Sequence, residues 1–289
     1  MPKGFATIRG SQSRQHNAIT IDVEDWYHIC GLDREPVIHP TMFRVHRNIR
    51  RILDLLSGFN IRATFFMLGC IAESDPELAK IITDGGHEIA SHGYSHRLVF
   101  ELSPAEFRSE IRRTSELLES QTGQRPIGFR APRWSLNMNT TPWAFHILAE
   151  EGYLYDSSLN PLPGVGNTKG SRAPFRLHTE CGDLMELPPL VAHTPLTNLP
   201  VGGGWGLRLF PASMICNAVD KYNALSWPAV LFVHPREVDP EGPRLDLSPL
   251  KGFAAYGTRK DVTPRLKRLF ARFSFTTMKE LAATCQSAY

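Results

Sequence analysis

Four short apolar segments of this chain each end in residues that can bind a metal or carry a proton. They lie at residues 17–23, 86–90, 127–129 and 229–233. Each has the length and composition of a buried strand. In α/β barrels and open α/β sheets, residues that follow the strands meet, because parallel strands share one carboxyl edge. The pattern therefore predicts an α/β fold with a site at that edge.

Helix signals fill the gaps between these segments. The sequence SPAE at residues 103–106 has the pattern of a capping box with proline in the first turn, and an apolar stripe follows it up to Gly123. Further helices are expected at residues 43–57, 76–84 and 142–151. Alternation of strand and helix predicts parallel pairing with right-handed crossovers.

Two stretches lack a sustained period. Residues 159–206 are rich in Pro, Gly and Thr, and residues 239–261 are similarly irregular. We expect both to form long loops over the mouth of the barrel. Within the first, Gly202-Gly203-Gly204 resembles a phosphate-binding loop only superficially, because no Lys-Ser or Lys-Thr pair follows it. It is expected to be a flexible loop at the rim of the cleft.

The second apolar segment is followed by His92 and His96. Two neutral imidazoles four residues apart on a turn can bind one divalent cation, and zinc prefers such ligands. Alone, this spacing is weak evidence, because a chain with 11 histidines produces it by chance. The metal interpretation therefore depends on the other strand ends.

The first segment ends in Asp22, Glu24 and Asp25, and the third and fourth end in Arg130 and His234. Side chains alternate along a strand, so Asp22 and Glu24 share a face. Carboxylates are costly to bury unless they are paired or bind a metal. The alternative for the first segment is a solvated turn after an edge strand.

The chain resembles the polysaccharide deacetylase family, with NodB homology (carbohydrate esterase family 4 in the broad sense), in four ordered motifs: TIDVED (20–25), SHGYSH (91–96), RAP (130–132) and LFVH (231–234). It is similar to the exopolysaccharide-associated branch found beside exosortase systems in GGGW (202–205), HPRE (234–237) and the tail 265–277. The resemblance covers residues 18–280. It implies a deformed (β/α) barrel of about seven βα units and metal-dependent removal of acetyl groups from an N-acetylated sugar.

The resemblance also implies a role for each residue. Asp22 would be the general base that deprotonates the attacking water, and Arg130 would pair with Asp22 and keep it ionised. His92, His96 and one carboxylate would hold the metal, which lowers the pKa of a bound water and polarises the carbonyl. His234 would be the general acid that protonates the leaving amine.

The sequence departs from the commoner family pattern in two places. Many members have two adjacent aspartates, but here Val23 follows Asp22, so the ligand carboxylate is Glu24 or Asp25. Alternation along the strand favours Glu24. Arg133 replaces a tyrosine that is frequent in relatives. Its backbone N–H can still serve an oxyanion hole, and its guanidinium can pair with a carboxylate or phosphate on the glycan.

Length and composition fit a single domain. With 289 residues, of which 42% are hydrophobic, the chain can bury a full core. We expect a polar extension at residues 1–17 and one catalytic domain at residues 18–289. The net charge is only +3, and the sequence has no basic run with interleaved aromatics, which argues against a nucleic-acid partner.

Targeting signals and cysteine content indicate in which cellular compartment a protein resides. The first residues are polar, and no run of about eighteen apolar residues occurs, so we expect neither a secretory signal nor a transmembrane segment. Five scattered cysteines predict reduced thiols rather than a disulfide framework. These features predict a cytoplasmic protein.

Several other residues have competing interpretations. Asp156 can support His234 or cap a turn. Trp134, Trp205 and Tyr94 can stack on sugar rings or belong to the core. Surface or supporting roles are expected for the histidines without a motif partner, which are His28, His39, His46, His87, His146, His178 and His193.

The sequence therefore predicts a metal-dependent hydrolase that removes N-acetyl groups from amino sugars of a bacterial polysaccharide or its lipid-linked precursor. Zinc is the expected ion, and nickel or cobalt would also suit the ligands. The expected partner is an N-acetylated oligo- or polysaccharide. One alternative is a glycan-binding protein without activity on the same fold, although a binding module does not need this full set of polar residues. The other is a hydrolase of a small cyclic ureide, which the fold alone does not distinguish.

Overall fold

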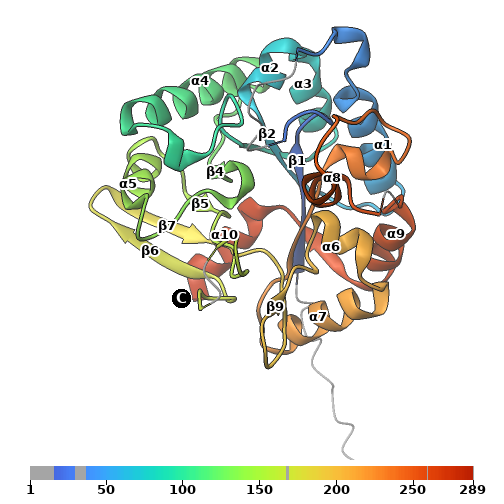
Figure 1. Cartoon of the computed structure of the whole chain (residues 1–289). Coiled ribbons are helices and arrows are strands. Elements are labelled where there is room, and N and C mark those ends of the chain that lie inside the picture. The colour runs from blue at the N-terminus through green and yellow to red at the C-terminus, as the bar shows by residue number, and fades with distance from the viewer. Residues whose placement is uncertain (1–15, 30–36, 167–168, 259, 289) are drawn as a thin grey trace, which may run out of the picture.

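The computed structural model describes residues 16–29, 37–166, 169–258 and 260–288 (Figure 1). Its main element is a curled half-barrel sheet of nine strands in the order β10-β1-β2-β3-β4-β5-β7-β6, with β11 also paired to β1. Within this sheet every described pair is parallel except β6–β7. The predicted α/β class is confirmed. The strands are β1 (His16–Val23), β2 (Thr64–Met67), β3 (Glu88–Ser91), β4 (Gly128–Phe129), β5 (Tyr155–Asp156), β6 (Phe175–Thr179), β7 (Gly182–Glu186), β10 (Val230–Val233) and β11 (Ser274–Thr276).

Helices alternate with the strands from β1 to β5, as the sequence predicts. The capping box that opens α4 (Pro104–Thr122) is present: Ser103 accepts from the backbone N–H of Glu106, and the Glu106 carboxylate accepts from that of Ser103. The helix ends at Gly123, whose φ of 71° is left-handed. The other α-helices are α1 (Val45–Ser57), α2 (Gly69–Ser74), α3 (Pro76–Asp84), α5 (Pro142–Glu150), α6 (Gly204–Leu209), α7 (Ala212–Ala224), α8 (Pro249–Tyr256), α9 (Thr263–Arg272) and α10 (Met278–Ala288). Short 3₁₀ helices are η1 (Pro40–Met42), η2 (Val99–Glu101), η3 (Pro132–Trp134) and η4 (Pro235–Val238).

Both faces of the sheet are buried. Adjacent residues on β2 show this: Phe65 packs in the large apolar cluster beneath the outer helices, and Phe66 packs in a separate cluster that includes Met278 of α10. Helix α10 contacts β1 and β7 near the middle of Figure 1. Burial on two faces explains why the strands read as apolar runs rather than as alternating patterns. No helix in the described part of the chain combines the length and apolar composition needed to span a bilayer.

The two stretches expected to be loops contain regular structure. Residues 159–206 include the hairpin β6–β7, which extends the main sheet beside β5, and a small sheet of β8 (Ala192–His193) and β9 (Asn198–Leu199). Residues 239–261 include α8. The loop prediction was wrong for these segments. In β6 only one of the five residues is buried, so the sequence contains no apolar run at that strand. Of the predicted extension 1–17, only His16 and Asn17 lie within the described residues, and they already belong to β1.

The glycine-rich segment is packed rather than flexible, which corrects a second expectation. A Cβ on Gly203 would lie 2.3 Å from the carbonyl oxygen of Phe232, and one on Gly202 would lie 2.4 Å from that of Leu190. The backbone N–H of Phe232 donates to the Gly202 carbonyl at 2.9 Å. Glycine is needed here because two backbone segments approach without room for side chains.

A pair of buried acids connects β5 to β7. Asp156 and Glu186 are register partners, and both are fully buried. Burial raises the pKa of both carboxyls, and the neighbouring charge of Asp156 raises that of Glu186 further. Burial beside the charge of Asp156 therefore favours the protonated form of Glu186.

This pair should make folding stability fall as pH rises. The native pKa of Glu186 lies well above its ordinary 4.5, so the native state binds more protons than the unfolded state between those two values. Each pH unit in that window costs about 1.4 kcal/mol of unfolding free energy. Glu186→Gln should remove this slope, because its amide has nearly the shape of the carboxyl and does not titrate. Denaturant unfolding between pH 5 and 9, with exposed Glu77→Gln as control, measures it. Parallel pH profiles of wild type and Glu186→Gln would contradict the raised pKa of Glu186.

Candidate active site

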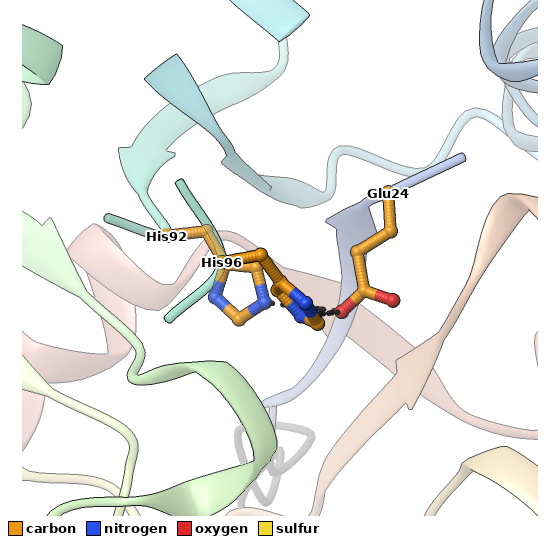
Figure 2. Close-up of side chains that lie close together, drawn as sticks. All are labelled: Glu24, His92 and His96. Carbon is orange, nitrogen blue, oxygen red and sulfur yellow. Dashed lines mark hydrogen bonds and ion pairs between the residues drawn. The ribbon is translucent and has the colours of Figure 1, made fainter. Parts of the chain in front are cut away.

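Three predicted metal ligands meet at the carboxyl edge of the sheet. Glu24 follows β1, His92 follows β3, and His96 lies in the turn after it. Glu24 Oε1 lies 3.2 Å from His92 Nε2 and 3.0 Å from His96 Nε2. Figure 2 shows the carboxylate pointing at both imidazoles. One ligand atom from each residue lies within 4.8 Å of the others, which is the size of a metal site.

The donor chemistry fits a cation. His92 Nδ1 lies 2.7 Å from the carbonyl oxygen of Arg130, which can only accept, so Nδ1 carries the proton. In the neutral ring, Nε2 then turns its lone pair toward the Glu24 carboxylate at 3.2 Å. Two electron-rich atoms at this separation require a proton or a cation between them. Tetrahedral zinc with bonds near 2.1 Å would separate its ligands by about 3.4 Å, close to the distances found here.

The loop that carries the two histidines is held by Glu110 of α4. Its carboxylate accepts hydrogen bonds from the backbone N–H groups of Tyr94 and Ser95 and from the Ser95 hydroxyl. His96 has a left-handed φ of 63°, which these bonds help to maintain. Sequence reasoning missed Glu110, because its partners are backbone groups that no motif identifies.

Glu24 stays ionised despite its burial. Burial alone raises the pKa of this carboxyl, but the charges of His96 and His234 and the close contacts with both ligand imidazoles outweigh it and hold the pKa well below the usual range. Its second oxygen, Oε2, accepts from Arg236 Nη1 at 3.0 Å. The Arg236 contact is a further feature that the sequence did not predict.

Asp25 is occupied elsewhere. Its side chain accepts hydrogen bonds from the backbone N–H groups of Trp26, Arg44 and Val45, at distances of 2.7 to 3.2 Å. It therefore satisfies the first N–H groups of α1 rather than facing His92 and His96. Of the two acids that the sequence left open, Glu24 is the one beside the imidazoles, and its role as a ligand stays a prediction.

Asp22 and Arg130 form the expected pair. Arg130 Nη1 donates to Asp22 Oδ1 at 2.7 Å and to the Thr20 hydroxyl at 2.7 Å, while Nε and Nη2 bind the backbone carbonyl and hydroxyl of Ser157. The guanidinium is fully buried and lies 4.2 Å above the ring of Phe66. Asp22 is thereby fixed beside Glu24 in a position from which its other oxygen, Oδ2, faces His234.

His234 lies on the other side of the two acids. Its Nε2 is 3.8 Å from Asp22 Oδ2 and 3.9 Å from Glu24 Oε1, and its Nδ1 is 3.3 Å from Glu237 Oε1. Burial raises the pKa of Glu237, but the hydrogen bond and charge of His234 bring it below the usual range. Glu237 thus supports the imidazole, a role that the sequence had offered to Asp156. Asp156 instead accepts from the hydroxyl and N–H of Ser158, within its own turn.

His28 and the segment Arg133-Trp134 border this cluster. His28, expected to be a surface or supporting histidine, places its ring 5.8 Å from that of His96, and its Nδ1 accepts from the Asp25 N–H. Burial, helped by the charge of His96, lowers the pKa of His28 to about 3. Arg133 and Trp134 have successive left-handed φ values of 49° and 57°. The Trp134 ring lies 5.0 Å from the Arg130 guanidinium and therefore packs against the site.

Two protein families match different parts of the chain. Residues 32–147 match the polysaccharide deacetylase family, and residues 157–283 match a domain of unknown function (DUF3473). The likeness to the exosortase-associated branch stays a prediction.

Named relatives align with part of the chain. A peptidoglycan deacetylase-like protein from Gibberella zeae is 37% identical over 39% of this chain, a peptidoglycan deacetylase from Helicobacter pylori 32% over 45%, and a peptidoglycan-N-acetylglucosamine deacetylase from Bacillus cereus 38% over 32%. The aligned segments span 32%, 43% and 34% of these relatives, less than half of their length.

Solved structures share the fold over almost the whole chain. A candidate polysaccharide deacetylase from Mycobacterium smegmatis superposes with a TM-score of 0.64 at 24% identity, covering 99% of this chain and 95% of the other. Puue allantoinase superposes with a TM-score of 0.61 at 15% identity, covering 95% and 91%. At these identities the likeness concerns the fold. The family match thus concerns residues 32–147, and the superpositions show a shared fold over almost the whole chain.

Proposed function

We propose that this chain is a metal-dependent hydrolase that removes N-acetyl groups from amino sugars of a bacterial polysaccharide or its precursor. One observation carries the proposal: the Glu24, His92 and His96 cluster adjoins both an arginine-paired aspartate, Asp22, and His234. Ligand atoms for a cation, a carboxylate that can act as a base and an imidazole held by Glu237 thus lie together at the carboxyl edge of the sheet. Amide hydrolysis requires these three kinds of group.

Each residue has a task in the proposed reaction. When bound by the three ligands, a divalent cation would lower the pKa of a water molecule and polarise the amide carbonyl. Asp22 accepts the proton of the attacking water, and Arg130 holds its carboxylate in place through a hydrogen bond of 2.7 Å. His234 then gives a proton to the departing sugar amine, with Glu237 stabilising the charged imidazole.

Acetate release from a panel of N-acetylated oligosaccharides, with and without added divalent metal, tests this function. Metal-dependent release would support it. Hydrolysis of a small cyclic ureide without acetate release would favour the ureide alternative. The fold is compatible with it, because this chain superposes on an allantoinase. Glycan binding with no turnover in any metal would instead favour a binding protein.

Removal of ligands should separate metal binding from folding. Glu24→Ala and the double variant His92→Ala, His96→Ala should each lose the metal, since a site left with one or two ligands binds weakly. Asp25→Ala is the matched control: it should keep the metal and lose about 1 kcal/mol of unfolding free energy, because it caps α1. Elemental analysis after dialysis and denaturant unfolding measure the two effects. Stoichiometric metal in the double variant would place the site elsewhere.

Asp22 and His234 should affect turnover without affecting metal content. Asp22→Asn cannot accept the proton of water, so we expect a loss in kcat of about 10² to 10⁴. His234→Ala should also lose activity, but less on an O-acetyl ester than on the amide, because an alkoxide depends less on protonation than an amine nitrogen does. Steady-state kinetics on the two substrates measure this difference. Equal losses on both would point away from His234 as the general acid.

Glu237 should act through His234. Glu237→Gln keeps the shape of the side chain but removes the charge that stabilises a protonated imidazole, so kcat should fall about tenfold or more while KM changes little. Exposed Glu241→Gln four residues on is the control. The pH profile of kcat, recorded alongside, should shift for Glu237→Gln only. A rise in KM with an unchanged profile would indicate a purely structural role.

A further inference from the structure

Arg236 connects the turn after β10 to the acid of the candidate metal centre. Its Nη1 donates to Glu24 Oε2 at 3.0 Å. The other oxygen of the same carboxylate, Oε1, lies 3.2 Å from His92 Nε2 and 3.0 Å from His96 Nε2. Figure 2 shows one oxygen of Glu24 directed at the two imidazoles and the other pointing away from them. The two oxygens of this carboxylate therefore have different partners.

The guanidinium is carried by a short turn that is largely buried. Arg236 lies in η4, whose other residues, Pro235, Glu237 and Val238, are all buried. The Val238 carbonyl accepts from Arg51 Nη1 at 3.2 Å, which ties the end of the turn to α1. The Arg236 side chain is 15% exposed, and the carboxylate it binds is 4% exposed. Because proline fixes φ at the start of the turn, Arg236 approaches the carboxylate from a backbone with little freedom.

A glutamate needs such a partner more than an aspartate does. Its side chain has one more rotatable bond, so holding it in one orientation costs more conformational entropy. As a metal ligand, a carboxylate can offer either one oxygen or both. Because Val23 follows Asp22 in this chain, the acid beside the imidazoles is the longer Glu24. Arg236 thus supplies a constraint that the longer side chain lacks.

The number of oxygens that Glu24 offers decides what else a metal ion can bind. His92, His96 and one carboxylate oxygen make three ligand atoms, and a catalytic site with three protein ligands keeps a position for water or substrate. With both oxygens bound, Glu24 itself would fill such a position. The guanidinium opposes this second contact, because Oε2 already accepts from it and its positive charge would repel a cation approaching that oxygen.

We propose that Arg236 is a positioning residue that keeps Glu24 a one-oxygen metal ligand and so keeps a position open for the attacking water. The inference rests on the proposed metal-dependent hydrolysis and deepens it. Arg130 has a different task, because it holds Asp22, the base, rather than a ligand. A purely structural Arg236 would only offset the buried charge of Glu24 and would not affect how a metal is bound.

Cobalt(II) bound to the whole chain tests this role. It suits the same ligands as zinc, and its visible absorption weakens as its coordination number rises. Arg236→Gln is polar but too short to reach Glu24, so the freed carboxylate should bind through both oxygens. We expect one equivalent of cobalt in wild type and variant, a weaker visible band in the variant, and a fall in kcat of about tenfold or more. Arg236→Lys, whose cation stands on a side chain one atom shorter, should restore part of the band and of kcat.

Arg51→Gln is the matched control, because Arg51 binds the end of η4 without contacting Glu24. Its cobalt spectrum and kcat should equal those of the wild type. An unchanged band in Arg236→Gln, loss of cobalt binding in that variant, or the same change in Arg51→Gln would overturn the proposal.

The crystal structure of the zinc-loaded wild type is a second test that needs no variant to fold. Glu24 should contact the ion through Oε1 while Oε2 stays bound to Arg236, and both oxygens within about 2.2 Å of the ion would refute the one-oxygen role. The expected spectra without any acetate release would remove the proposed activity and leave the role of Arg236 in place. A wild type that binds no metal would overturn both.

Discussion

The buried ion pair of Arg130 and Asp22 is the interaction on which the edge of the sheet depends. A guanidinium without solvent exposure is costly, and here it is offset by Asp22, by the Thr20 and Ser157 oxygens and by an aromatic face. These partners come from β1, β2 and the turn after β5, so one side chain ties together strands that are far apart in sequence. Loss of either charge would leave the other buried and unpaired, at a cost of about 3 to 5 kcal/mol.

The candidate site draws on the entire described chain. Asp22 and Glu24 precede the segment that matches the polysaccharide deacetylase family, His92, His96 and Arg130 lie inside it, and His234 falls in the segment that matches a domain of unknown function. Neither matched segment holds the full set. Strands β1 and β10 bring the pieces together, because they pair in parallel from Ala18 to Ile21 and their following residues emerge side by side.

Much of the site could be predicted because its main residues lie at or just after the ends of apolar runs, and parallel strands of a curled sheet bring their carboxyl ends together. Asp22 lies at the end of β1, Glu24, Arg130 and His234 follow apolar runs, and His92 and His96 stand in the turn after β3. Glu110 and Arg236 could not be predicted in this way, since they act on backbone groups or on an acid far away in sequence. Glu237 lies three residues after His234, but its contact with the imidazole depends on the turn of η4, which brings its carboxylate back to His234. The sequence did not predict that turn. The β6–β7 hairpin was missed because its exposed edge leaves no apolar signal.

The two adjacent acids after β1, Glu24 and Asp25, have different partners, and this difference limits how far the backbone at Glu24 can move. Asp25 is bound to the first N–H groups of α1, so the chain direction is fixed one residue away from Glu24. Although Glu24 stands outside any strand or helix, its backbone therefore has the rigidity of the helix that Asp25 anchors. A shorter acid at position 24 would be left about one methylene short of the imidazoles, since the main chain could advance toward them only by unwinding the start of α1.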